Sequence, residues 1–123
     1  DGLSMSVGSA LAEANFVIFG NNNADTGTTS SSLSGISKRS KREWNFDEKG
    51  TVTADVKIDI SDATGHSGSI SAASNYKLLF KTCEFCNFLE LETGDSASGD
   101  VITFSNVTIQ DGIFCIASAD SNL

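Results

Sequence analysis

Apolar residues fall on every second position through the middle of the chain, and this alternation constrains the fold more than any other feature. Trp44 and Phe46 share one face of a first run, and a second run alternates in the same way. Successive side chains of a β-strand point to opposite faces, so the pattern predicts half-buried antiparallel strands. We expect strands over 43–47 and 51–60, joined by a hairpin turn over 47–50. The second strand should turn one face to the core: Val52, Ala54, Val56, Ile58 and Ile60.

Shorter patterns predict six further strands. The run from Phe16 to Phe19 is apolar at every position, which indicates a strand covered on both faces. In another, Leu89 and Leu91 should face the core, and the alternation slips phase near 105–106, which predicts a β-bulge. The expected ranges are 3–7, 15–20, 75–82, 87–93, 100–110 and 112–119.

About eight short strands with no helical periodicity predict an all-β fold. We expect an antiparallel β-sandwich, immunoglobulin-like or jelly-roll-like, with a β-barrel as the alternative. A length of 123 residues suits a single domain over 1–123.

Composition narrows the classes of partner and the location. The net charge of −8 disfavours nucleic acid and anionic lipid. No apolar run approaches the ~18 residues that span a bilayer, so we expect no membrane insertion. Ser, Thr, Gly, Asn and Asp are abundant and Pro is absent, which favours a secreted or cell-surface protein.

The three cysteines favour a disulfide over a cofactor site. Cys83 and Cys86 form a Cys-x-x-Cys motif, with two residues between them, and Cys115 stands alone. In an oxidising compartment either Cys83 pairs with Cys86, or one of them pairs with Cys115. With His66 the set is numerically a zinc set, but its members are too scattered for the usual paired spacing. We expect no metal and no cofactor.

A basic cluster interrupts the otherwise acidic chain. Lys38, Arg39, Lys41 and Arg42 supply half of its eight basic residues. Such residues often solvate a strand face, but a positive patch on a negative body also complements another copy of the same protein.

Several motifs resemble one known domain family across nearly the whole chain. The most specific part is 39–52, which contains Glu-Trp-Asn-Phe-Asp-Glu-Lys-Gly-Thr-Val; Tyr-Lys-Leu-Leu follows at 76–79 and Gly-Asp-Val-Ile-Thr-Phe at 99–104. The chain resembles an uncharacterised β-sandwich domain of large secreted surface proteins and adhesins of Gram-negative bacteria. The resemblance implies an extracellular module without catalytic residues. The chain departs from the family at Asn21, where His is common, and at 81–86, which replaces an Asp-rich, calcium-like loop.

These observations give three hypotheses for function. The first is a non-enzymatic structural or adhesive module, with copies of itself or neighbouring domains as partners, which assembles, even into a filament, by β-strand addition. Its pairing strand would be an exposed terminal one, 112–119 or the N-terminal strand with Leu3, Met5 and Val7. The second is a carbohydrate-binding module that presents Trp44 or Tyr76 to a surface glycan. The third is a hydrolase that uses Glu90 and Glu92.

Overall fold

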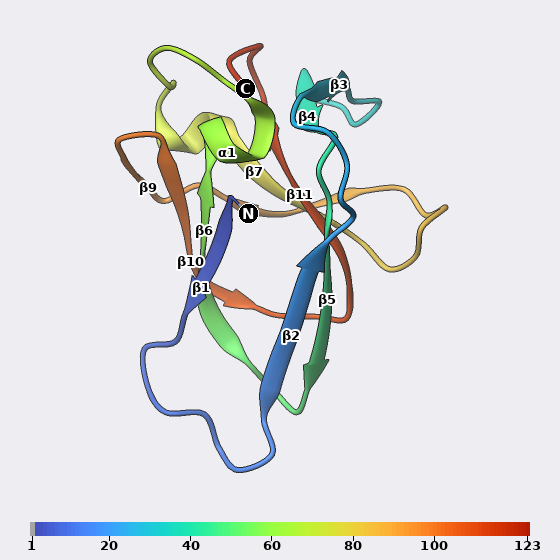
Figure 1. Ribbon diagram of the computed structural model, residues 1–123, viewed down its shortest axis with the longest axis vertical. Helices are drawn as coiled ribbons and strands as arrows, with labels where there is room; N and C mark the ends of the chain where they lie inside the picture. Colours follow the sequence, from blue (N-terminus) through green and yellow to red (C-terminus); the bar gives the residue numbers. More distant parts are fainter. Residues whose placement is uncertain (1) are drawn as a thin grey trace.

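Two antiparallel β-sheets, of four and seven strands, face each other in this computed structural model (Figure 1). The four-stranded sheet has the order β1-β6-β10-β9, and the larger sheet contains β2, β5, β11, β4 and β3, with β7 and β8 attached to β11. The structure describes residues 2–123, so Asp1 of the expected domain lies outside the described residues. The predicted antiparallel sandwich is confirmed, and the barrel alternative is wrong because the two sheets stay separate.

Eleven strands are present among the described residues, three more than expected. The three unexpected strands, β3, β4 and β9, have only three residues each. The bounds are β1 Leu3–Ser6, β2 Phe16–Asn21, β3 Thr28–Ser30, β4 Lys38–Ser40, β5 Trp44–Lys49, β6 Thr53–Asp59, β7 Tyr76–Lys81, β8 Leu89–Thr93, β9 Ser96–Ser98, β10 Val101–Thr108 and β11 Gly112–Ser118.

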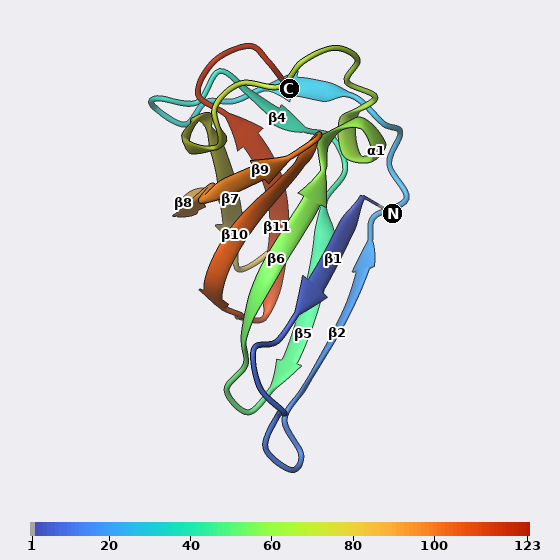
Figure 2. The ribbon, with the colours of Figure 1, turned by 90° about the vertical axis from the view of Figure 1, so that its left-hand side faces the viewer.

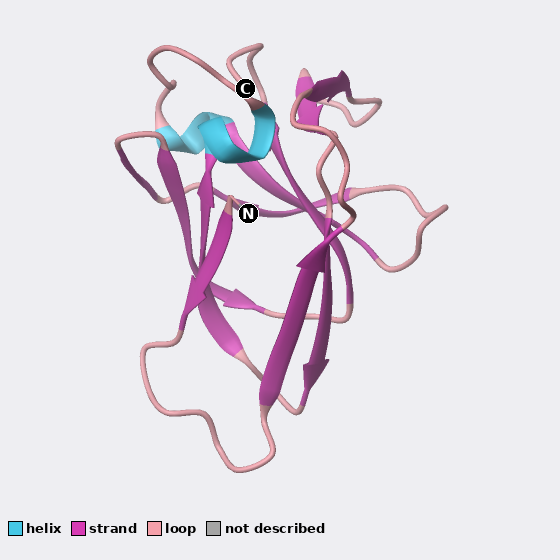
Figure 3. Ribbon diagram, viewed as in Figure 1, coloured by secondary structure: helices cyan, strands magenta, loops and turns pink. Residues whose placement is uncertain are grey.

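The two helical segments, α1 (Ile60–Thr64) and η1 (Ala73–Asn75), cover one end of the sandwich (Figure 3). The Asp59 carboxylate caps α1 by accepting a hydrogen bond from the backbone N–H of Asp62 at 2.9 Å. Gly65 ends the helix in the left-handed conformation, which glycine adopts without steric cost. α1 begins at the last residue of the strand expected over 51–60, and η1 ends at the first residue of the strand expected over 75–82. Both segments are too short to leave a periodic signal.

The alternating run fills the core between the sheets, as predicted. Trp44 is 1% exposed, and Phe46 stacks on Phe114 with ring centroids 4.3 Å apart. Ile58 lies opposite Ile102 in the β6–β10 ladder, and both are fully buried. The predicted core face of the second run is buried throughout: Val52, Ala54, Val56, Ile58 and Ile60.

The predicted hairpin between the two alternating runs is wrong. β5 belongs to the seven-stranded sheet and β6 to the four-stranded sheet, so the chain crosses the sandwich between them. Gly50 turns the chain at φ +80°, and a Cβ there would collide with the Asn15 side chain. Val52 then enters the core. Alternation shows which face of each strand is buried. The pattern is identical whether two successive strands pair in one sheet or lie in facing sheets, so it could not distinguish a hairpin from a crossover.

The predicted bulge is confirmed in β10. The β6–β10 register shifts between Phe104 and Val107, and Asn106 adopts φ +55°. The Asn106 N–H donates to the Asp55 carboxylate at 2.9 Å, which provides a partner for a backbone group that the bulge removes from the ladder. Both apolar flanks, Phe104 and Val107, therefore remain buried.

A small second core lies on the outer face of the seven-stranded sheet. The fully buried side chains of Leu79, Cys115 and Ala117 form it together with Ile36. Leu33 and Phe88, from two separate loops, pack over this group. β11 is therefore covered on both faces, and the loops that cover it frame one of the surfaces described below.

Candidate functional site

β1 is already paired within its own domain. Leu3 lies opposite Ile58 and Met5 opposite Val56 in the β1–β6 ladder. Both side chains are half-buried against the core, whereas Val7 follows the strand and is exposed. β1 is the end strand of its sheet, so its outer backbone edge stays open, but its apolar side chains are largely used inside the domain.

The C-terminal strand is not an exposed edge, and this part of the prediction is wrong. β11 pairs with β5 and β4 along one side and with β7 along the other. The backbone groups of a central strand are occupied on both sides. A position near the end of the sequence therefore does not place 112–119 at the end of a sheet.

β2 is the edge strand with the most exposed apolar surface. It pairs with β5 only. Phe16 is 44% exposed, Ile18 63% and Phe19 39%, while Val17 packs against the core. The prediction that this run is covered on both faces is wrong for the isolated chain. Its composition is that of a buried strand, but one edge and part of each face remain uncovered.

The open edge of β2 carries the backbone groups of alternate residues. The Asn22 N–H donates to the Glu43 carbonyl at 2.8 Å, at the end of the β2–β5 ladder. In an antiparallel ladder, N–H and C=O groups alternate between the two sides of a strand. The groups of Phe16, Ile18 and Gly20 therefore point to β5, and those of Val17, Phe19 and Asn21 point outward.

The other four edge strands, β1, β3, β8 and β9, are shorter or carry charge, and β3 has only three residues. β8 places Glu90 and Glu92 along an exposed strand, and such charges hinder pairing with another chain. β9 has three residues and β1 has four. β2 has six residues and none of them is charged. Among the described edges, β2 is therefore the one least protected against strand addition.

β1 and β2 are edge strands of the two facing sheets at one side of the sandwich, and β8 and β9 are edge strands at the opposite side (Figure 2). Between β1 and β2 is a hollow of 220 Å³ lined by Met5, Val7, Leu11, Val17 and Phe19, among others. On the core side of this hollow the Phe19 ring packs against the Phe46 ring, with ring centroids 5.5 Å apart. The apolar surface of β2 thus continues into the gap between the sheets.

The basic cluster is only partly free. The Arg39 guanidinium donates to a Glu43 carboxylate oxygen at 3.0 Å. Arg42 donates to the carbonyl oxygens of Asp62 and Ala24 and so ties two loops together. Lys41 is exposed and Lys38 half-exposed. The structure therefore divides the predicted patch into two arginines with internal contacts and two lysines at the surface.

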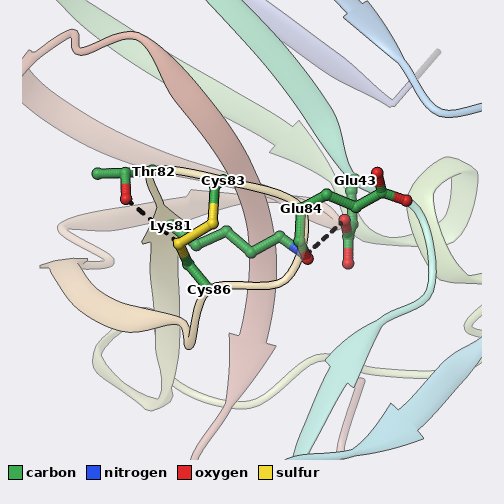
Figure 4. The surroundings of a disulfide bond; sticks show 6 residues. All are labelled: Glu43, Lys81, Thr82, Cys83, Glu84 and Cys86. Atoms are coloured by element: carbon green, nitrogen blue, oxygen red, sulfur yellow. Dashed lines mark hydrogen bonds and ion pairs between the residues drawn. A yellow bond between two sulfur atoms is a disulfide. The ribbon is translucent and has the colours of Figure 1, made fainter.

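Arg39, Glu43, Lys81 and Phe88 form a compact cluster on the outer face of the seven-stranded sheet. Lys81 Nζ lies 3.1 Å from Glu43 Oε2 and donates to the Glu84 carbonyl at 3.1 Å (Figure 4). The Phe88 ring contacts both cations, with its centroid 4.9 Å from the Arg39 guanidinium carbon and 4.5 Å from Lys81 Nζ. The cluster anchors the disulfide loop to the sheet.

Cys83 and Cys86 are joined in a disulfide with a Cα–Cα distance of 5.1 Å, the first of the pairings left open by the sequence. Cys115 is a free, fully buried thiol. Burial raises the pKa of Cys115 to about 12, because a thiolate there would lose its hydration. None of the three cysteines is thus both exposed and in the thiol form.

An open groove of 570 Å³ runs between the disulfide loop and the β3–β4 loop. Arg39 and Lys81 lie at its base, and the Ser30–Ser32 hydroxyl groups lie along one wall. Phe85, at the tip of the disulfide loop, is 93% exposed and stands on the opposite wall. The groove thus combines an aromatic face with several hydrogen-bonding groups, a combination common in ligand sites.

The residues proposed for sugar binding or hydrolysis lie elsewhere. Trp44 and Tyr76 are buried in the core, so neither offers a ring to a glycan. Glu90 and Glu92 are exposed, and Lys77 Nζ lies 3.2 Å from Glu90 Oε1. Leu89 is exposed instead of facing the core as predicted, because it is the first residue of β8, an edge strand with no neighbour beyond it in the sheet.

The metal-ligand candidates do not converge. Cys83 and Cys86 are bonded to each other, Cys115 lies in the second core, and His66 lies in the loop after α1. Across residues 2–123 no group of three or more His, Cys, Asp or Glu side chains is arranged to hold a metal ion. Neither helical segment in this range is long and apolar enough to cross a membrane.

Two exposed features were missed as sites in the sequence. For β2 the sequence did contain a signal, because Phe16–Phe19 is apolar at every position and so needs cover on both faces. That this strand lies at a sheet edge could not be predicted. Phe85 stood between the two cysteines of the predicted staple, and a four-residue disulfide loop leaves its central side chains outside the core.

The fold and these surfaces define an antiparallel β-sandwich domain with an open apolar edge. In the comparison with protein families, residues 4–113 match the model of a domain of unknown function, DUF8202. The chain therefore belongs to the DUF8202 family. No curated protein and no solved structure matches it.

Proposed function

We propose that this domain is a non-enzymatic interaction module of a secreted or cell-surface protein, and that it binds a partner strand along the open edge of β2. One observation carries the proposal: β2 combines free backbone groups with exposed Phe16, Ile18 and Phe19. The expected partners are another copy of the domain or a neighbouring domain of the same surface protein.

The physical basis is β-strand addition. Backbone hydrogen bonds form with any extended partner, whatever its side chains, and apolar side chains add affinity and register. Full burial of a large apolar side chain contributes roughly 1.5–3 kcal/mol, and these three are part-exposed, so each would contribute less. Three such residues on one edge strand form a continuous apolar surface, so together they contribute more to binding than apolar residues scattered singly over a surface.

The surface lysines offer a second, electrostatic contribution. Lys38 and Lys41 lie on a protein with a net charge of −8, so they would attract an acidic partner, another copy included. Arg39 and Arg42 contribute less to such contacts because their side chains hold internal hydrogen bonds. Lys41→Glu is therefore a cleaner test of docking charge than any change of the arginines.

An extracellular location is supported by the Cys83–Cys86 disulfide, since such bonds persist in oxidising compartments. The scarcity of lysine and abundance of Ser, Thr, Gly, Asn and Asp agree with it. Measuring whether this bond is intact in protein taken from its native source, with thiols blocked at lysis, tests the location. A fully reduced pair would contradict it.

The test of strand addition uses a labelled peptide copying residues 15–22, with lysines appended for solubility, and fluorescence polarisation. Val17→Pro removes an outward N–H without removing a β2–β5 hydrogen bond, and proline is tolerated at such edge positions. Val17→Ala is the matched control because it shortens the same side chain and keeps the N–H. The wild type and Val17→Ala should bind the peptide, and Val17→Pro should not. Equal binding by all three, or none by the wild type, would reject the proposal.

A second candidate function, glycan binding, is favoured by the groove beside the disulfide loop. Phe85 offers an open aromatic face, and Ser30–Ser32 and Arg39 offer hydrogen-bonding groups across the groove. The test is titration with a panel of soluble oligosaccharides. Phe85→Ala should abolish binding, while Phe16→Ala on β2 should leave it unchanged; absence of binding by the wild type would reject this candidate.

A further inference from the structure

We infer that β2 pairs with β2 of a second copy, antiparallel, about a two-fold axis that passes through Ile18. This inference rests on the proposed function and identifies its partner. The two copies would place Ile18 opposite Ile18 and join their seven-stranded sheets into one continuous sheet.

The first argument is the chemistry of the edge. A two-fold interface brings the same patch of both copies together, so the patch must be complementary to itself. A charged edge fails this condition, because like charges would meet directly across the ladder. β2 contains Phe16, Val17, Ile18, Phe19, Gly20 and Asn21, so no charge opposes itself in any register.

The second argument is the alternation of faces. Phe19 contacts Phe46 in the core and Val17 packs against the same core, so these two side chains face inward. Phe16 and Ile18 therefore face outward. Paired residues of an antiparallel ladder share one face, so an inward residue must oppose an inward one. This condition excludes a register centred between two residues and admits only those centred on a residue.

The third argument selects the centre. A ladder centred on Ile18 pairs Val17 with Phe19 twice and keeps residues 16–20 of β2 within it. One centred on Val17 retains only residues 16–18 and pairs Phe19 with Asn15, outside the strand. One centred on Phe19 pairs Val17 with Asn21 and Ile18 with Gly20. The Ile18 register thus buries most apolar surface.

The backbone agrees with this register. Val17 and Phe19 carry the outward N–H and C=O groups, so each Val17–Phe19 pair exchanges two hydrogen bonds. Ile18 then sits in the non-hydrogen-bonded position, where opposing Cα atoms approach to about 4.5 Å. Two Ile18 side chains, each 63% exposed in the single copy, would cover each other there.

The longer of the two other edges of this sheet is β8, since β3 has only three residues. Pairing of β2 with β8 of the next copy would build an open chain of molecules. The antiparallel order β2-β5-β11-β7-β8 leaves β2 and β8 pointing the same way, so translated copies would pair in parallel. Parallel pairs are slightly less stable per residue, and β8 brings Glu90 and Glu92 to the contact. The two-fold contact closes after two copies, and a filament would need a further interface.

Cysteine crosslinking tests the register in the full chain. Ile18→Cys places two thiols at about 4.5 Å between Cα atoms, within disulfide range. Phe16→Cys is the matched control: it lies on the same outward face, but its partner is Gly20. The native cysteines do not interfere, because one pair is bonded and Cys115 is buried. Under mild oxidation Ile18→Cys should form a covalent dimer and Phe16→Cys should form no covalent dimer, whereas Phe16→Cys with Gly20→Cys should crosslink.

Sedimentation of the wild type supplies the second measurement. A concentration-dependent monomer–dimer equilibrium is expected, and Ile18→Lys should shift it to monomer by placing two like charges opposite each other. A wild type that stays monomeric up to about 1 mM, or equal crosslinking of the two single cysteine variants, would overturn the inference. If the labelled peptide still binds in that case, the proposed function stands with a different partner; if it does not bind, both fail.

Discussion

Lys81 Nζ lies 3.1 Å from Glu43 Oε2 and so links the end of β7 to the residue before β5, across the intervening β11. The Lys81 side chain is 8% exposed, and the second carboxylate oxygen of Glu43 accepts from Arg39. A mostly buried lysine must be paired, since unpaired charge away from water is costly. This ion pair therefore fixes the base of the groove on the outer face of the sheet.

Lys81→Met should lower the free energy of unfolding by about 1–3 kcal/mol, because it leaves a Glu43 oxygen and the Glu84 carbonyl without their donor. Lys77→Met is the matched control: Lys77 pairs with Glu90, whose side chain is 43% exposed. An exposed pair of this kind is worth about 0–1 kcal/mol. Denaturant titration measures both, and equal losses would contradict the structural role of Lys81.

Trp44→Ala should cost about 3–5 kcal/mol, because it empties a fully enclosed site in the core. Trp44→Phe should cost less. Within the described part of the chain, the buried Trp44 Nε1 has no hydrogen-bond partner, so its removal breaks no hydrogen bond. Thermal and denaturant unfolding give both values. A loss below about 1 kcal/mol for Trp44→Ala would show that the side chain does not support the core.

The cysteines should react in three distinct stages with a thiol reagent. In the native, unreduced protein no thiol should react, because Cys83 and Cys86 are bonded and the pKa of Cys115 is raised to about 12 by burial. Unfolding without reductant should release one reactive thiol, and reduction should release all three. Rapid reaction in the native state would contradict the burial of Cys115, and Cys115→Ser identifies the thiol released by unfolding.

Asp120 should make stability depend on pH in the acid range. Hydrogen bonds from the Ser118 and Ser71 hydroxyl groups lower the pKa of this carboxyl below its usual 3.8. A lowered folded-state pKa stabilises the fold above the unfolded pKa, and this contribution disappears as the pH falls through the folded value. Asp120→Asn should therefore destabilise the protein near neutral pH and lose part of that effect at about pH 2. Urea titrations at the two pH values test this, and an effect that grows in acid would contradict it.

The inside and outside of most strands were readable from the sequence. Val56 and Ile58 alternate with Asp55 and Lys57, and this period of two admits only one way to bury the apolar set. The bulge was visible for the same reason, because the alternation of β10 resumes out of phase after Asn106. The disulfide was one of three open pairings, since spacing alone does not decide which cysteines meet.

The position of each strand within a sheet was not readable. Phe16–Phe19 has the composition of a central strand and forms an edge, whereas β11 lies near the C-terminus and is central. The groove was equally hidden, because its walls come from loops about fifty residues apart in sequence. Neighbours of this kind are set by contacts between distant segments, which no local pattern records.

The sequence by itself determined the β-structure, the core face of each alternating strand and the lack of charge on Phe16–Asn21, because these depend on side-chain identity and a local period of two. Only the tertiary structure decided that β5 and β6 belong to facing sheets and that β2 ends its sheet with one backbone edge free. Strand order is fixed by the packing of the whole chain around one core, so an unfilled edge is a property of the folded molecule. That edge, present in the fold and absent from any local pattern, is where we expect this domain to meet its partner.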